Sequence, residues 1–350
     1  MDITFLVGNG FDLSLGYATS YESFYKYYLD QPNDPKYDEA VSRLKLDIEE
    51  DRIREKKNWS DFEIGLGRFT KHFRQDETTM FVDAYRDAHQ HMLKYLSQRP
   101  KYDIINSMPE NELDKIRRNL CFFYQECKER DRNFFYGMNQ SDQSSGSPAK
   151  FHFISFNYTD FLDKCIEKIA QKPLDSMGIY PGKRNHILDK NVIHVHGTLS
   201  SYPIMGVSEE EQIFNQTFRK NNRLRICLLK QKGIDKTGVL RSSDAIKIIK
   251  NSRIICLWGV SLGESDKHWW KIINEWLKIN TNNFVFIFEH DPNPPSGLFV
   301  LDDVQKELTV ANRLLCHSGY SEDESLTSRI HVIFNTDKVL SFPKIIDPNK

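Results

Sequence analysis

The sequence lacks the features that mark several classes of protein. Its six cysteines are scattered without CxxC pairs, so we expect neither a zinc site nor a disulfide framework. No apolar run approaches the length that spans a bilayer, and Asp2 follows Met1 where a secretory leader would be basic and then apolar. A formal net charge of −1 over 350 residues argues against a nucleic-acid partner. We therefore expect a cytoplasmic, globular protein without a bound metal.

What the sequence does contain is a series of strand-like apolar runs. They cover residues 3–8, 150–156, 191–197, 253–260, 283–291 and 329–335. From residue 150 onward helix-length connections separate them, which favours a parallel sheet with helices on both faces. Residues 31–149 instead show dense mixed charge and helical patterns. We predict a Rossmann-like, doubly wound α/β domain of residues 1–30 plus 150–350, with a helical insertion at 31–149.

Four of these runs end in small or polar residues. The four ends read GNGFD (8–12), SFNYTD (155–160), HVHGT (194–198) and GVSLGESD (259–266). In an open parallel sheet, ligands bind outside the carboxyl ends of the strands, near the point where the strand order reverses. We therefore expect these four segments to meet at one crevice.

The first segment is an incomplete dinucleotide fingerprint. Gly8 and Gly10 have the right spacing, but Leu13 stands where the third glycine belongs. The paired glycines favour close approach of the backbone to a ligand. Asp12 has two readings of equal weight: an acid in the first turn of a helix, stabilised by the helix dipole, or a functional carboxylate.

The next two segments supply an amide and two histidines. Asn157 follows a strand, where its side chain either caps the next helix together with Thr159 or faces a sugar hydroxyl or water. His194 and His196 have strand spacing and so should face the same side. We favour His196 as the functional one, because it lies at the strand end directly before Gly197.

Two alternative chemistries remain open. GVSLG matches the G-x-S-x-G nucleophile elbow, which would make Ser261 an acylating serine, although the following helix is expected to begin only near Ser265. A metal-dependent nuclease would instead need paired acids, for which the sequence offers Asp12, Glu63, Asp160 and Asp266. Glu63 is also explained as half of a capping box with Ser60, or as a residue that points into the crevice.

Taken in order, the segments at 5–16, 19–25, 59–63, 155–160, 192–197, 203–207 and 258–266 resemble the AbiH-type phage abortive-infection family. That family is distantly similar to sirtuin-like NAD-binding domains. The resemblance implies an antiphage effector that binds NAD and hydrolyses its N-glycosidic bond, with NAD as substrate. A non-catalytic nucleotide-binding module is a further alternative, and a homo-oligomer or a partner defence protein stays open.

The resemblance also implies roles for individual residues. Asn157 would position the ribose and a water molecule, and His196 would act as a base. The chemistry of the N-glycosidic bond, and not the resemblance, adds Asp12 as the carboxylate that would stabilise the ribosyl cation. The residues expected to bind the nucleotide are Gly8, Asn9, Gly10, Phe11, Gly197, Gly259, Ser261 and Asp266.

Overall fold

The computed structural model describes residues 1–54, 59–98, 104–144, 148–172, 174 and 186–344. Its centre is a sheet of six strands with the order β3-β2-β1-β4-β5-β6, in which every neighbouring pair is parallel. The strands are β1 (Asp2–Val7), β2 (Lys150–Ser155), β3 (Ile187–His194), β4 (Ile254–Trp258), β5 (Phe284–Glu289) and β6 (Ile330–Phe334). All the predicted strands form, and the predicted doubly wound α/β fold is confirmed.

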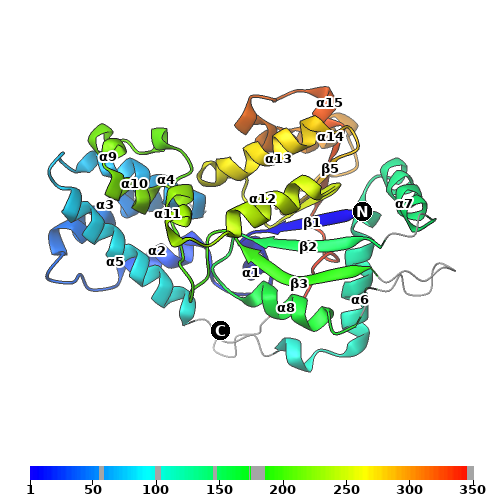
Figure 1. The fold of residues 1–350 in the computed structure, drawn as a ribbon, viewed down its shortest axis with the longest axis horizontal. Helices are drawn as coiled ribbons and strands as arrows, with labels where there is room; N and C mark the ends of the chain where they lie inside the picture. The colour runs from blue at the N-terminus through cyan, green and yellow to red at the C-terminus, as the bar shows by residue number, and fades with distance from the viewer. Residues whose placement is uncertain (55–58, 99–103, 145–147, 173, 175–185, 345–350) are drawn as a thin grey trace.

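Both faces of the sheet are covered, which explains why the inner strands β4 and β5 are almost continuously apolar. On one face Phe5 and Phe153 pack against α6 (Glu110–Cys121), α7 (Glu129–Ser144) and α8 (Phe161–Ile169). On the other face Leu6 and Ile154 pack against α12 (Arg241–Asn251), α13 (Lys267–Ile279), α14 (Val300–Leu315) and α15 (Glu324–Thr327). Figure 1 shows α12, α13, α14 and α15 above β1, β2 and β3, and α8 below them.

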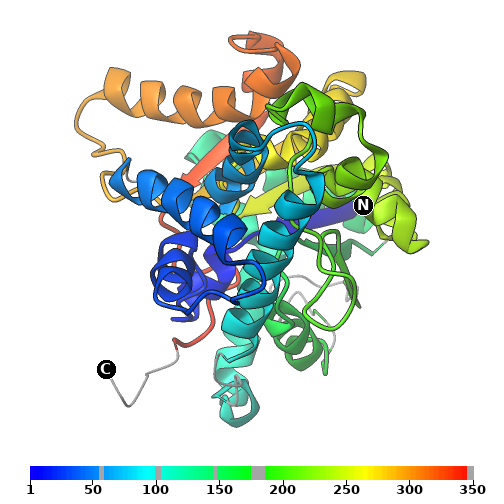
Figure 2. The same ribbon diagram turned by 90° about the vertical axis from the view of Figure 1, so that its left-hand side faces the viewer.

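A separate helical lobe lies beyond the carboxyl ends of the strands (Figures 1 and 2). It has its own hydrophobic core, to which α2, α3, α4, α5, α9 and α10 contribute. The lobe consists of α2 (Tyr21–Leu29), α3 (Asp38–Ile53), α4 (Trp59–Phe69), α5 (Thr78–Ser97), α9 (Gln216–Lys220), α10 (Asn222–Leu228) and α11 (Lys230–Thr237). The lobe therefore overhangs the edge of the sheet at which ligands bind in this class of fold.

Residues 31–149, assigned to a helical insertion from the sequence, contribute to two different cores. Helices α3, α4 and α5 belong to the lobe, whereas α6 and α7 cover one face of the sheet. The lobe also takes residues 205–229, which follow β3 in the chain. Segments far apart in sequence thus build the structure over the sheet edge.

Among the described helices, none combines the length and the hydrophobicity needed to cross a bilayer.

Candidate functional site

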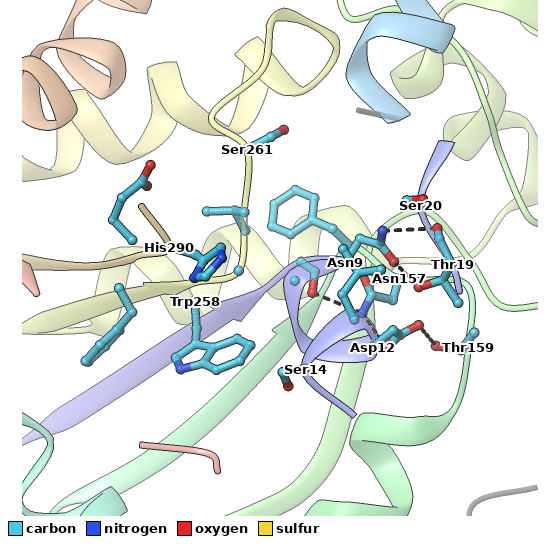
Figure 3. Close-up of a pocket in the computed structure, with 18 of the residues that line it drawn as sticks. Asn9, Asp12, Ser14, Thr19, Ser20, Asn157, Thr159, Trp258, Ser261 and His290 are labelled. Carbon is cyan, nitrogen blue, oxygen red and sulfur yellow. Dashed lines mark hydrogen bonds between the residues drawn. The ribbon is translucent and has the colours of Figure 1, made fainter. Parts of the chain in front are cut away.

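A cavity of about 800 Å³ lies at the carboxyl edge of the sheet, where β1 and β4 adjoin and the strand order reverses. Its size falls within the range of small-molecule sites. Residues from all four predicted strand ends line it, among them Asp12, Asn157, His196 and Ser261, and α4 contributes Glu63. The expected convergence of the four segments on one crevice is therefore present, and Glu63 points into it from the lobe. Figure 3 shows one view of this wall.

The two glycines of the first turn, Gly8 and Gly10, lie against the backbone of the loop after β4. A Cβ atom on Gly8 would lie 2.6 Å from the carbonyl oxygen of Gly259, and one on Gly10 would lie 2.5 Å from the Cα of Gly259. The N–H groups of Gly8 and Gly10 donate to the carbonyl oxygens of Trp258 and Gly259, each at 2.9 Å. Both glycines line the cavity. Their small size serves the contact between the loops after β1 and β4, and their N–H groups are already engaged.

Asp12 joins the loop after β1 to the loop after β2. The amide Nδ2 of Asn157 donates to Asp12 Oδ1 at 2.9 Å and to the carbonyl oxygen of Gly8 at 3.1 Å. The hydroxyl of Thr159 donates to Asp12 Oδ2 at 2.6 Å (Figure 3). Thr159 is therefore not the cap of α8, whose N-cap residue is Asp160. These bonds orient the Asn157 amide so that its Oδ1 is left as an acceptor.

The environment of Asp12 changes its acidity. Asp12 lies in the first turn of α1 (Gly10–Ser14) and only 1% of it is exposed. Burial raises its pKa from 3.8 to about 7, and the hydrogen bonds from Thr159 and Asn157 oppose this rise only in part. Near neutral pH the carboxyl is thus close to half protonated.

The two histidines at the end of β3, His194 and His196, have different surroundings. His194 is held between the carbonyl oxygen of Asn157, at 2.9 Å from its Nδ1, and Asp163 of α8, at 2.8 Å from its Nε2. The Nε2 of His196 lies 3.1 Å from Asp266 Oδ1. The prediction that both histidines face the same side assumed strand geometry, but β3 ends at His194, before His196. Of the two, His196 lines the cavity.

A group of charged residues closes the cavity beneath the lobe. Lys230, the first residue of α11, donates from its Nζ to Glu63 Oε2 at 2.7 Å and to Asp266 Oδ1 at 2.8 Å. Asp266 ends the short helix η5 (Glu264–Asp266), and Glu63 comes from α4. We call Glu63, Lys230, Asp266 and His196 the ionic cluster. It connects the lobe to the strand ends.

The members of the ionic cluster shift each other's acidity. Burial alone would raise the pKa of Asp266, but Lys230 and His196 hold it below its ordinary value. Burial raises the pKa of Glu63, despite the opposing charge of Lys230. For Lys230, burial favours the neutral amine, yet the two carboxylates keep its pKa above the usual value. Two carboxylates whose pKa values are driven apart in one cavity are typical of acid–base sites.

The loop after β4 does not have the form of a nucleophile elbow. Ser261 is exposed, and α13 begins only at Lys267. The strained backbone belongs to Leu262, with φ of +51°, and not to the serine. His317 contacts this loop, but through the carbonyl oxygen of Leu262 at 2.9 Å. The geometry therefore gives no support to an activated Ser261.

The remaining predicted nucleotide-binding residues differ in position. Gly259 and Asn9 line the cavity, and the Asn9 side chain is bound to Thr19 through both its oxygen and its nitrogen. Phe11 is buried in the core below the sheet, against Trp258. A Cβ atom on Gly197 would lie 2.1 Å from the carbonyl oxygen of Tyr202. Phe11 and Gly197 are thus packing residues outside the cavity wall.

The nuclease alternative requires a group of side chains that can bind a metal ion. Within the described part of the chain, no group of three or more histidine, cysteine, aspartate or glutamate side chains could hold a metal ion. Where Glu63 and Asp266 come together, the ammonium group of Lys230 lies between them. Asp160, the N-cap residue of α8, pairs with Lys164.

Sequence reasoning missed Lys230. It belongs to no local motif, and it reaches Glu63 and Asp266, which line the cavity, only because α11 packs in the lobe beside α4 and η5. A lysine at the start of a charged helix otherwise indicates only a solvated surface.

Comparison with known families gives a match over most of the chain. The family model described as "Bacteriophage abortive infection AbiH" matches residues 4–288, which include most of β1, all of β2, β3 and β4, and nearly all of β5. All four cavity-lining strand ends lie within the match. No curated protein matches this chain.

Proposed function

The chain belongs to the AbiH family of bacteriophage abortive infection proteins, and we propose that it acts in this defence by hydrolysing NAD in the cavity. The family indicates the biological role. The chemistry is our inference from the site. One observation carries it: Asn157 and His196, from two neighbouring strand ends, each present an unused acceptor atom to a cavity at the reversal point of a doubly wound sheet.

The acceptor on Asn157 suits a ribose hydroxyl or a water molecule. Its Nδ2 is committed to Gly8 and Asp12, so Oδ1 is the atom available to a ligand. Because the amide cannot rotate without losing both bonds, the acceptor is already oriented before a ligand binds. In this proposal Asp12 acts mainly through Asn157, and its charge, when ionised, also favours a nearby ribosyl cation.

His196 is the proposed base. Asp266 remains ionised and lies 3.1 Å from Nε2, which favours the tautomer with the proton on Nε2. Nδ1 then carries a lone pair, and no described residue forms a hydrogen bond with it. An imidazole oriented by a carboxylate is the arrangement that general bases use.

The reaction is a substitution at the anomeric carbon of the nicotinamide ribose. The bond from C1′ to the pyridine nitrogen breaks, and its electron pair leaves with neutral nicotinamide. The oxygen of a water molecule attacks C1′ and its proton passes to His196, from which it is released to solvent. The products are ADP-ribose, nicotinamide and a proton. The cost lies in the oxocarbenium-like transition state, which nearby negative charge stabilises.

The test is nicotinamide release from NAD by the purified chain, alone and with extract of phage-infected cells. We expect His196→Ala and Asn157→Ala to lower the rate about 10²- to 10⁴-fold. His72→Ala is the matched control, since His72 lies on the lobe outside the cavity. No release by the wild type under either condition would refute hydrolysis, and equal release by the wild type and all variants would refute the roles of Asn157 and His196.

A further inference from the structure

The cavity has a second end that the proposed hydrolysis does not use. In Figure 3, Trp258 and His290 lie on the opposite side of the view from Asn157 and Thr159. This second end is built from the ends of β4, β5 and β6, and Phe342 and Glu289 also line it. We call it the β5 end. A cavity that extends over both sides of the reversal point accommodates a ligand with two halves.

Glu289 is the acid of the β5 end. It is the last residue of β5, and its carbonyl oxygen accepts from the N–H of Asn335 at 2.8 Å, which fixes the backbone. Arg313 of α14 donates to Oε1 at 2.6 Å, and 18% of the glutamate side chain is exposed. No described residue donates to Oε2. One carboxylate oxygen is therefore anchored and the other is available at the cavity wall.

This arrangement matches what a ribose diol needs. A carboxylate at a strand end accepts hydrogen bonds from adjacent ribose hydroxyls in dinucleotide-binding folds, whereas a phosphate on the 2′-oxygen requires a free cation instead. Arg313 is adjacent, but Glu289 already engages it. At Glu289 a 2′-phosphate would therefore meet the carboxylate and a guanidinium that is already paired, whereas the other cation that lines the cavity, Lys344, comes from the segment after β6.

We infer that Glu289 receives the ribose diol of the adenosine half and makes the cavity selective for a dinucleotide without a 2′-phosphate. The inference rests on the proposed function in that NAD is the ligand, and it adds the orientation of that ligand. The nicotinamide ribose lies toward Asn157 and His196, and the adenosine lies toward the β5 end. The sequence offered no candidate for this acid, because Glu289 lies far from the first glycine turn in the chain.

NADH and NADPH are the probes that test this inference. They differ only in the 2′-phosphate, and their reduced nicotinamide is not a neutral leaving group, so binding is measured without cleavage. Titration calorimetry is done with the wild type, Glu289→Gln, Arg313→Gln, Asn157→Ala and Glu307→Gln. Glu307 is the matched control, because its ion pair with Lys128 is also 2.6 Å long and lies outside the cavity.

We expect the wild type and Glu307→Gln to prefer NADH by about 10-fold or more, and Glu289→Gln to lose most of that preference. Arg313→Gln should keep or increase the preference, because the charge of Glu289 remains. Asn157→Ala should weaken both ligands and leave their ratio unchanged. Thermal unfolding of each variant verifies that it is folded.

The inference is overturned if the wild type binds neither ligand, binds both equally, or keeps its preference in Glu289→Gln. These results are separable from the fate of the proposed hydrolysis. A Glu289-dependent preference for NADH without nicotinamide release from NAD would refute hydrolysis alone. Turnover of NAD together with equal binding of NADH and NADPH would refute the role of Glu289 alone.

Discussion

Asp12 and Asp266 lie in the same cavity, yet their acidity is shifted in opposite directions. Asp12 accepts hydrogen bonds from a neutral amide and a neutral hydroxyl, and its pKa rises to about 7. Asp266 lies beside Lys230 and His196, and its pKa falls below the ordinary value. Burial penalises the charge of both. Only a buried cation reverses the effect, so the cavity holds one aspartate that titrates near neutrality and one that stays ionised.

The contrast between the two aspartates gives Asp12, beside Asn157, a different role from Asp266, beside His196. On the Asn157 side, Asp12 orients an amide and requires no counter-ion. On the His196 side, the cations of the ionic cluster keep Asp266 charged, and its Oδ1 lies 3.1 Å from the histidine Nε2. The cluster also ties α4 and α11 to the strand ends, which makes the lobe part of the site.

The test with the largest expected effect removes the cation, Lys230. Lys230→Met leaves Glu63 and Asp266 buried together without their partner, and we expect a loss of about 3–5 kcal/mol in the free energy of unfolding at pH 7. Urea denaturation measures it. Asp266 should then resemble Asp12, with a raised pKa, so that the variant recovers stability at lower pH.

Lys232→Met is the control for this change. Lys232 is on the same helix and forms no ion pair with a described residue, so its replacement should cost less than about 0.5 kcal/mol. Equal effects of the two substitutions would show that Lys230 does not hold the carboxylates together.

The second test uses the pH dependence of Asp12. Between about pH 4 and pH 7 the folded protein holds a proton on Asp12 that the unfolded chain, with a pKa near 3.8, has released. The contribution of this proton to the free energy of unfolding is therefore fully present below pH 4 and is lost as the pH rises to 7. We expect the unfolding free energy of the wild type to fall, relative to Asp12→Asn, by up to about 4 kcal/mol across this range.

Asp76→Asn is the matched control, because Asp76 is exposed, lies outside the cavity and pairs with Arg74 on the surface of the lobe. Its difference from the wild type should be nearly constant over the same pH range. If Asp12→Asn behaves in the same way, Asp12 does not titrate near neutrality and the contrast with Asp266 is wrong.

Much of the fold was predictable because its central strands, β4 and β5 above all, are largely apolar. Runs such as Ile254–Trp258 bury every residue, so they stand out from the charged helices around them. The convergence of Asn157 and His196 was predictable as well, since parallel strands place their carboxyl ends at one edge. Local patterns could not show what each side chain binds. Thr159 has the spacing of a cap but donates to Asp12, and the amides of Gly8 and Gly10 are engaged by the loop after β4.

The ionic cluster was beyond prediction for a different reason. Glu63 and Lys230 are 167 positions apart, and only the packing of the lobe brings them together. The charge of Lys230 is compensated by residues on two other elements, and no periodicity of the sequence indicates these ion pairs. The same holds for Glu289, whose position in the cavity depends on the order of the strands.

The test with the smallest expected effect removes a neutral group that donates a hydrogen bond to Asp12. Thr159→Val keeps the shape of the side chain but removes the hydroxyl that donates to Asp12 Oδ2 at 2.6 Å. We expect a loss of about 1–3 kcal/mol at pH 7, against a smaller loss for the exposed Thr309→Val. Because this hydrogen bond lowers the pKa of Asp12, its removal should also move the upper end of the pH window above 7. An unchanged window would mean that burial alone sets the acidity of Asp12. The difference between the two aspartates would then depend only on Lys230 and His196.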